Sequence, residues 1–226
     1  MEVLDTLRSL RQMHADLRMV FTGSVGLHNV ISSLKRSGYA NAPTNDMAAV
    51  DVPALSPEDA QELACRLLEG EGIQTVDLQE TARTIAVAVD CIPFFIHHIV
   101  DEIAQRGNSA NMATISEVVD ACLTDSYDRW HLRYYRERIE TYYTANERPL
   151  ALNLLDVLSG SGQPLPFDDL FNLLQSRLVN ADSEMTRRVL TTLQRDHYVI
   201  QQPDSRFCFR FPLIRRSWRI QRGLGS

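Results

Sequence analysis

Residues Leu17 to Leu27 read LRMVFTGSVGL, an apolar run that ends in a glycine and serine turn. An apolar run of about five residues before such a turn is typical of a parallel strand that helices cover on both faces. Ligands of open α/β sheets bind at the C-terminal ends of the strands. The hydroxyls of Thr22 and Ser24, which follow the run, are therefore candidate ligand-binding groups. An ordinary strand with a tight turn is the alternative.

The other elements expected before residue 55 add little sheet. Residues 2–14 have the apolar stripe of an amphipathic helix, and residues 25–35 have a second helical pattern. Met47 to Val52 is a candidate last strand. Two strands are too few for an independent doubly wound domain. Residues 1–55 are therefore predicted to be the residual edge of an α/β sheet.

A series of helices is predicted from Ser56 onward. Ser56, Pro57 and Glu58 supply a hydroxyl cap, a proline at the first helical position and an acid near the positive end of the helix. This helix is expected to end near Leu68. Later apolar patterns predict helices over residues 77–89, 93–106, 114–127 and 130–144, so that residues 56–145 form a helical domain and the whole chain is mostly α.

Aromatic side chains alternate with arginines over residues 126–143. Such rings stack on nucleic-acid bases in some proteins. They also anchor one domain to the next, and we favour the anchor here.

The last domain, residues 146–226, follows the order helix, helix, helix and hairpin. Prolines mark the start of the first two helices, and Asp182 or Ser183 caps the third. Alternating phenylalanines then lie on one face of the second hairpin strand. This order predicts a winged-helix domain.

The composition excludes several classes of protein. Hydrophobic residues make up 44% and charged residues 23% of the 226 residues, as in soluble globular proteins. No apolar run approaches the roughly 18 residues of a membrane span, and the N-terminus has no signal-peptide core. The four cysteines form no CxxC pair, which favours buried thiols in a reducing cytoplasm. We therefore expect a cytoplasmic protein with neither a metal site nor a catalytic constellation of its own.

The net charge of −6 is unevenly distributed along the chain. Residues 177–226 carry 10 basic and 4 acidic side chains, whereas the residues before them are strongly acidic. A basic end on an acidic body is typical of nucleic-acid binding. It is equally consistent with two parts of the chain that dock on each other.

Three short motifs, RMVFTGSVGL, DCIPFFI and FCFRFPLIRRSW, occur in this order along the chain. Together they resemble the sensor strand, helical lid and winged helix of the AAA+-related STAND ATPases, over about residues 2–222. The resemblance implies a P-loop NTPase fragment with domains at 1–55, 56–145 and 146–226. It makes Thr22, Ser24, Pro93 and Arg210 the candidate nucleotide-binding residues, with the proline near the adenine or ribose.

The chain also departs from that family. Cys91 stands where the G-x-P motif of the lid has glycine, and Phe211 stands where a histidine often senses the diphosphate. No G-x-x-x-x-G-K-[ST] loop or magnesium-binding acidic strand is present, and the one lysine, Lys35, follows no glycine loop.

We therefore predict the C-terminal part of an ATP-binding module that acts as a nucleotide-dependent switch or remodeller and is inactive as an enzyme alone. ATP or ADP with Mg²⁺ is expected only when the missing N-terminal ATPase half is supplied, by the same gene or by a partner protein.

The alternative function is that of a winged-helix DNA-binding regulator with a helical interaction domain. Its third helix would present Arg187, Arg188, Thr191 and Arg195 to the major groove, together with Thr186 and Gln194. The acidic body would mask this basic helix, so DNA binding is expected to be weak. A purely structural docking module is a third possibility.

Overall fold

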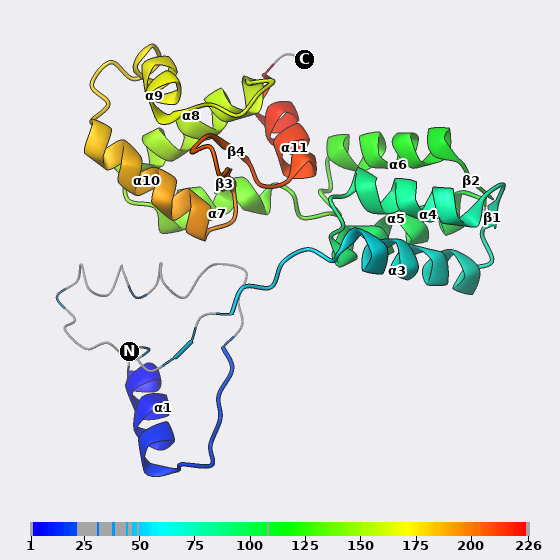
Figure 1. Ribbon diagram of the computed structural model, residues 1–226, viewed down its shortest axis with the longest axis horizontal. Helices are drawn as coiled ribbons and strands as arrows, with labels where there is room; N and C mark the ends of the chain where they lie inside the picture. The colour runs from blue at the N-terminus through cyan, green and yellow to red at the C-terminus, as the bar shows by residue number, and fades with distance from the viewer. Residues whose placement is uncertain are drawn as a thin grey trace. The chain divides into compact units, whose positions relative to one another are not determined.

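A computed structural model describes residues 2–21, 31, 38, 44, 47–48, 50–107 and 109–224. The chain divides into two compact units, Met1–Val52 and Pro53–Ser226. Helices make up most of the described residues, and the strands are two or three residues long (Figure 1). The predicted mostly α fold is therefore confirmed, whereas the division into three domains stays a prediction.

The first unit contains α1 (Glu2–Met13), the amphipathic helix expected near the N-terminus. Residues 17–21 follow it without forming a strand, and Val20 is 87% exposed. The buried strand predicted from Leu17 to Phe21 is therefore wrong. A strand needs a neighbour for its backbone N–H and C=O groups, and the described residues of this unit provide no paired strand.

Other predictions for the first unit fall on residues that the structure does not describe. Thr22 and Ser24 lie outside the described residues, as does almost all of the helix expected over residues 25–35. Residues 47–48 and 50–52, which cover most of the candidate last strand, form no strand.

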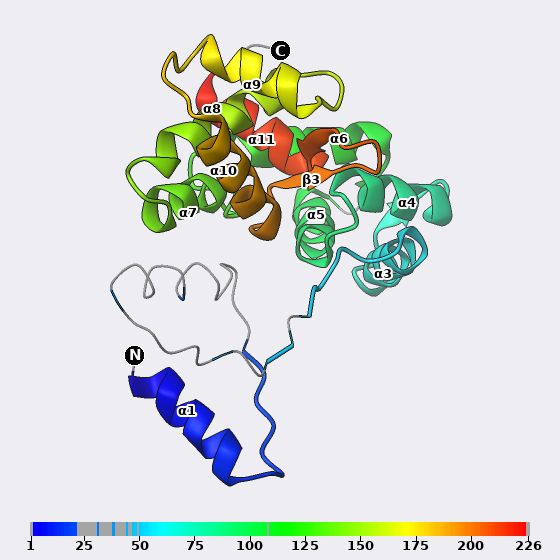
Figure 2. The same cartoon turned by 60° about the vertical axis from the view of Figure 1, so that its left-hand side comes forward.

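The second unit begins with a set of helices that we call the first helical group: α3 (Pro57–Gly70), α4 (Leu78–Ala88), α5 (Pro93–Arg106) and α6 (Met112–Thr124). Figures 1 and 2 show these helices side by side. The sequence predicted all of them to within a few residues. It did not predict the short parallel strands β1 (Gln74–Thr75) and β2 (Ser109–Ala110).

Side-chain caps explain where these helices begin. Ser56 Oγ accepts a hydrogen bond from the N–H of Asp59 at 3.1 Å, as expected for a helix that begins at Pro57. Asp77 and Asn111 cap α4 and α6 in the same way. The apolar faces of the helices then share one core, which includes Leu68, Ile85, Ile96, Ile99, Ile103 and Ile115.

The helix predicted over residues 130–144 is shorter in the structure, where α7 spans Tyr134–Tyr142. Residues 125–133 form a linking turn instead, in which Trp130 is 2% exposed and packs on Phe95. Arg138 is also buried, with its guanidinium carbon 5.3 Å from the ring centroid of Tyr198. At these positions the alternating aromatic and arginine side chains anchor neighbouring elements, as we favoured.

The second helical group consists of α7 and the elements that follow it: α8 (Glu147–Gly160), α9 (Phe167–Gln175), α10 (Ser183–Arg195), β3 (Val199–Gln201), β4 (Phe207–Phe209) and α11 (Pro212–Arg222). Three helices and a hairpin follow α7, in the predicted order. The strands β3 and β4 pair antiparallel, and Leu165 adds a bridge to Phe207. None of the helices formed by described residues is long and apolar enough to cross a membrane.

A buried carboxylate holds α11 against α8. The side chain of Asp156 on α8 is 5% exposed. It accepts hydrogen bonds from Trp218 Nε1 at 2.9 Å and from Nε and Nη2 of Arg222 at 2.9 and 2.7 Å. A bidentate pair between arginine and carboxylate is among the stronger polar contacts in proteins. Removing the Asp156 carboxylate would leave the charge of the Arg222 guanidinium without its partner in a partly buried place.

Asp156→Ala is therefore expected to lower the free energy of unfolding by about 3–5 kcal/mol. Urea denaturation at pH 7 measures this change. The control is Glu62→Ala, which removes an exposed partner of Arg66 on α3 and should change the free energy by less than about 1 kcal/mol. Two equally small changes would contradict the role that we give to Asp156.

Candidate functional site

The two helical groups of the second unit meet at a hydrogen bond between residues 123 positions apart. Asp90 Oδ2, in the loop before α5, accepts from the backbone N–H of Leu213 in the first turn of α11, with an N···O distance of 2.8 Å. Both segments belong to motifs that the sequence singled out, DCIPFFI and FCFRFPLIRRSW. The fold brings these motifs into contact, and their junction is the candidate functional site.

The loop before α5 has a left-handed backbone at two consecutive residues. Asp90 and Cys91 have φ of 56° and 57°, in the region that favours glycine. The N–H of Cys91 donates to Ala86 O at 2.8 Å, so the loop folds back on the end of α4. Pro93 is the first residue of α5, as predicted. Glycine is the residue that takes up this backbone conformation at the lowest cost.

On the other side of the junction, α11 begins without a cap of its own. Its N-cap residue, Phe211, makes no side-chain cap hydrogen bond. Asp90 supplies the cap from the first group, and negative charge at a helix N-terminus is favourable. Arg210 directs Nη1 toward Nδ1 of His197, at 2.8 Å. Arg210 is therefore close to Leu213 in the sequence, but its guanidinium is directed toward His197, in the turn that precedes β3.

Burial raises the pKa of Asp90 from its usual 3.8 to about 6, although the Leu213 N–H and the Arg216 guanidinium act in the opposite direction. A second contact crosses the same junction, where Arg216 Nη2 on α11 pairs with Asp120 Oδ1 on α6 at 2.7 Å. The Asp120 side chain is 60% exposed, so this pair contributes little. The junction thus holds one partly buried carboxylate, Asp90, and one exposed carboxylate, Asp120.

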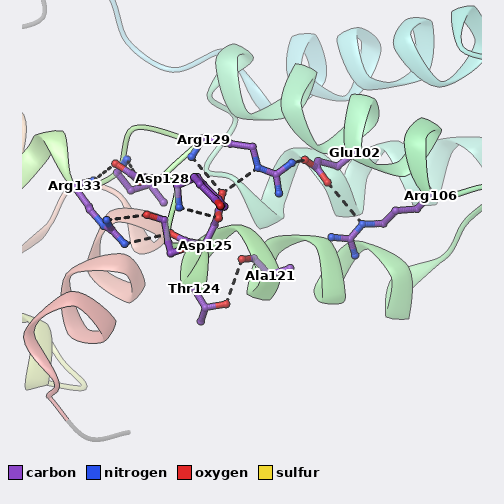
Figure 3. A network of polar contacts seen from close by, with 11 residues as sticks. Glu102, Arg106, Ala121, Thr124, Asp125, Asp128, Arg129 and Arg133 are labelled. Atoms are coloured by element: carbon purple, nitrogen blue, oxygen red, sulfur yellow. Dashed lines mark hydrogen bonds and ion pairs between the residues drawn. The ribbon is translucent and has the colours of Figure 1, made fainter.

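Ion pairs brace the turn that links the two groups (Figure 3). Arg129 pairs with Asp125 at 3.0 Å and also with Glu102 on α5. Asp128 accepts a hydrogen bond from the backbone N–H of Arg133 at 3.0 Å. The chain therefore leaves the first group in a defined direction, which helps to set where α11 meets the loop before α5.

An open cavity of about 490 Å³ lies between this turn, α7 and α11. Its wall carries both signs of charge, and the guanidinium of Arg136 is paired with Glu140 at 3.0 Å. The lining carries four carboxylates, from Asp125, Asp128, Glu137 and Glu140, and two guanidinium groups, from Arg133 and Arg136. Its lining includes Leu123, Asp125, Arg133, Glu137, Ser217 and Ile220.

The residues predicted to contact DNA lie on α10 and are exposed. Arg188, Thr191 and Arg195 follow one another at helical spacing on one face. The fourth residue, Arg187, is held by its own domain, since its guanidinium carbon lies 3.6 Å from the ring centroid of Phe167 on α9. Three of the four residues are therefore available to a partner of α10.

Thr186 does not face outward as predicted. Its side chain is buried, and Oγ1 donates to the carbonyl of Asp182 at 2.7 Å. The hydroxyl satisfies a backbone acceptor in the first turn of α10, so that prediction is wrong.

The four cysteine thiols are not activated as nucleophiles. Burial raises the pKa of all four cysteine thiols, that of Cys122 to about 11, so the reactive thiolate is scarce near neutral pH. Within the part of the chain that the structure describes, no three His, Cys, Asp or Glu side chains are grouped to hold a metal ion.

Sequence reasoning missed Asp90 and Arg216 as residues of the junction. The signal available for Asp90 was its place beside Cys91 and Pro93, in a motif already singled out. Nothing in the sequence indicates a partner for it on α11.

No family model and no curated protein matches the chain. One similar solved structure is that of a RuvB mutant from Thermotoga maritima, with 12% identity and a TM-score of 0.34 over 76% of this chain. The match covers 52% of that protein, so the chain spans about half of its length. A similarity of this size assigns the chain to no family.

Substitution of Cys91 tests whether its left-handed backbone is strained. Cys91→Val is expected to be less stable than Cys91→Gly by about 1–3 kcal/mol, because a β-branched residue is strained at positive φ. Urea denaturation of both variants measures the difference. At Arg83, exposed in the middle of α4, the order should reverse, since glycine is the poorer helix former. Equal stability of the two Cys91 variants would show that the backbone there is not strained.

Proposed function

We propose that the second unit acts as the lid and winged helix of a nucleotide-dependent switch of the AAA+/STAND type. The phosphate-binding half comes from another part of the protein or from a partner. The observation that carries this proposal is the hydrogen bond between Asp90 and Leu213. It joins the proline loop of the expected lid to the start of α11. In the family that the sequence resembles, these two segments face the base and the diphosphate of the nucleotide.

The two helices that begin at this junction both start with a proline and lack a side-chain cap from their own N-cap residue. α5 begins at Pro93 and α11 at Pro212, and neither N-cap residue supplies a side-chain cap. Helix N-termini attract anions, because their first N–H groups lack helical partners and lie at the positive end of the dipole. Phosphate charge brought near these ends would be favourable to the helices and unfavourable to the carboxylate of Asp90.

The opposite effects of phosphate charge on the helix N-termini and on the Asp90 carboxylate suggest how the switch works. A nucleotide held by the missing half would repel Asp90 from the start of α11, and the contact with Leu213 would loosen. The loop before α5 would then move relative to α11, and the second helical group would take up a new position. In this way a change in the bound nucleotide would change the position of the winged helix relative to the lid.

The second helical group supports the winged-helix part of the proposal. α8, α9 and α10 precede the β3–β4 hairpin, and Leu165, between α8 and α9, pairs with Phe207 of β4 at N···O distances of 3.0 and 2.7 Å. A short strand between the first two helices that joins the later hairpin is the arrangement of winged-helix domains. The last helix, α11, then returns to the junction.

The nucleotide proposal is tested in a polypeptide that joins this chain to a P-loop half. Pro93→Trp is expected to weaken the binding of ATP and ADP alike, because both share the base that the proline contacts. Ser24→Ala should lower turnover more than affinity, because it removes a contact to the reacting end. Calorimetry gives the affinities and phosphate release gives the turnover.

The control is Pro57→Trp, which alters the proline at the first position of another helix, α3, where it is exposed. It should leave both quantities unchanged. The 226-residue chain alone should not hold Mg-ATP tightly, because it lacks the phosphate loop. A low-micromolar dissociation constant for this chain, or unchanged constants in both site variants, would overturn the proposal.

DNA binding is the second candidate function, and the exposed face of α10 favours it. Arg188, Thr191 and Arg195 are exposed on α10, the helix that would enter the major groove in a winged-helix protein. The residues from 177 onward also carry a clear excess of positive charge. The side chain of Arg187 is held against Phe167, so we assign it to packing within the domain.

We expect weak, salt-sensitive binding of the whole chain to a labelled DNA duplex, measured by fluorescence anisotropy at about 50 and 200 mM salt. Replacing Arg188 and Arg195 by alanine should weaken it. Replacing Arg66 and Arg83, two exposed arginines of the first group, should not. Specific nanomolar binding near 150 mM salt would instead make DNA regulation the leading function.

A further inference from the structure

Asp90 lies between the two helical groups, where its side chain is partly shielded from solvent. Its backbone is left-handed, and its side chain caps a helix that begins 122 positions later in the chain, at Pro212. The contact with Leu213 is a partly buried polar link across the junction, whereas the neighbouring pair of Arg216 and Asp120 is exposed. A change at Asp90 therefore acts on the junction itself.

Opposing influences act on the charge of this carboxylate. Loss of water around the side chain disfavours the charged form, and this influence is the largest. The Leu213 N–H and the guanidinium of Arg216 favour the charged form. The net result is a pKa of about 6 for Asp90 when the two helical groups are in contact, compared with 3.8 for a solvated aspartate.

Other titratable groups face the same place. Arg216 lies on α11 and Tyr135 on α7, while the Cys91 thiol follows in the chain and has Glu58 of α3 in its surroundings. Burial raises the pKa of Tyr135 above its usual 10.0 and that of Cys91 above its usual 9.0. Neither group changes charge between pH 5 and 8, so among these buried neighbours Asp90 is the group that does.

We propose that Asp90 is a charge-sensitive latch between the two helical groups, and that the junction closes more tightly when its carboxylate loses its charge. The hydrogen bond survives protonation, because a carboxyl group still has an oxygen that accepts from the Leu213 N–H. What protonation removes is the free energy required to hold a charge away from water.

The direction of the pH effect follows from proton linkage. The closed junction, with the raised pKa, binds a proton more tightly than an open one in which Asp90 is solvated. Above about pH 7 the carboxylate is charged in both states, and the closed state bears the full penalty. As the pH falls through 6 toward 3.8, the closed state gains. The two pKa values predict a closed-to-open ratio about tenfold higher at pH 5.0 than at pH 7.5.

Amide hydrogen exchange of the intact chain tests this inference. The protection factor of the Leu213 amide, corrected for the intrinsic exchange rate at each pH, should rise about tenfold from pH 7.5 to pH 5.0. In Asp90→Asn the change should shrink to less than about twofold. Asparagine keeps the accepting oxygen and tolerates left-handed backbone.

Asp120→Asn is the matched control, since it neutralises the exposed carboxylate of the same junction. It should retain the full pH dependence. A second measurement needs no variant: the chemical shifts of the Asp90 side-chain carboxyl and of the Leu213 amide should titrate together, with a midpoint near pH 6. This titration also separates the effect from that of histidines, which change charge in the same range.

A midpoint below about 4.5, a pH dependence below about threefold, or an Asp90→Asn variant that keeps the dependence would each overturn the latch. The inference shares the contact between Asp90 and Leu213 with the proposed function but does not involve the nucleotide. Exchange measured without nucleotide therefore tests the latch alone, and the affinities of the Pro93 variant test the nucleotide site alone.

Discussion

The polar contact between the two groups of helices in the second unit centres on one carboxylate, that of Asp90. Asp90 reaches the start of α11 because two consecutive residues, Asp90 and Cys91, take up left-handed backbone conformations. The carboxylate exchanges water for one backbone N–H at 2.8 Å and the charge of Arg216. Its raised pKa shows that this exchange disfavours the charged form. Such a contact joins the groups weakly at neutral pH, which suits an element that changes state.

The elements on either side of the junction are held more firmly. Asp156 fixes α11 to α8 through Trp218 and Arg222. The linking turn is braced by Arg129, which pairs with α5. A disturbance at Asp90 would therefore be expected to shift helices as groups rather than to loosen single helices, because these polar contacts hold α11 to α8 and the linking turn to α5.

Contacts within the second helical group also decide which side chains of α10 are available on its exposed face. Thr186 and Arg187 are used within the domain, the first on the carbonyl of Asp182 and the second on the ring of Phe167. Arg188, Thr191 and Arg195 remain on the outer face. A surface of two arginines and a threonine supports modest attraction to a phosphate backbone, and a conformational role for this domain requires none of them.

Local sequence determined the helices of the second unit, because caps and first-turn prolines act within a few residues of themselves. Ser56, Pro93 and Asp182 each mark a helix start that the structure contains. The same reasoning failed for Leu17 to Phe21, since a strand depends on partners elsewhere in the chain. Tertiary structure alone decided that Asp90 caps α11. The carboxylate and the N–H that it accepts are 123 residues apart, and they meet only after both groups of helices have packed.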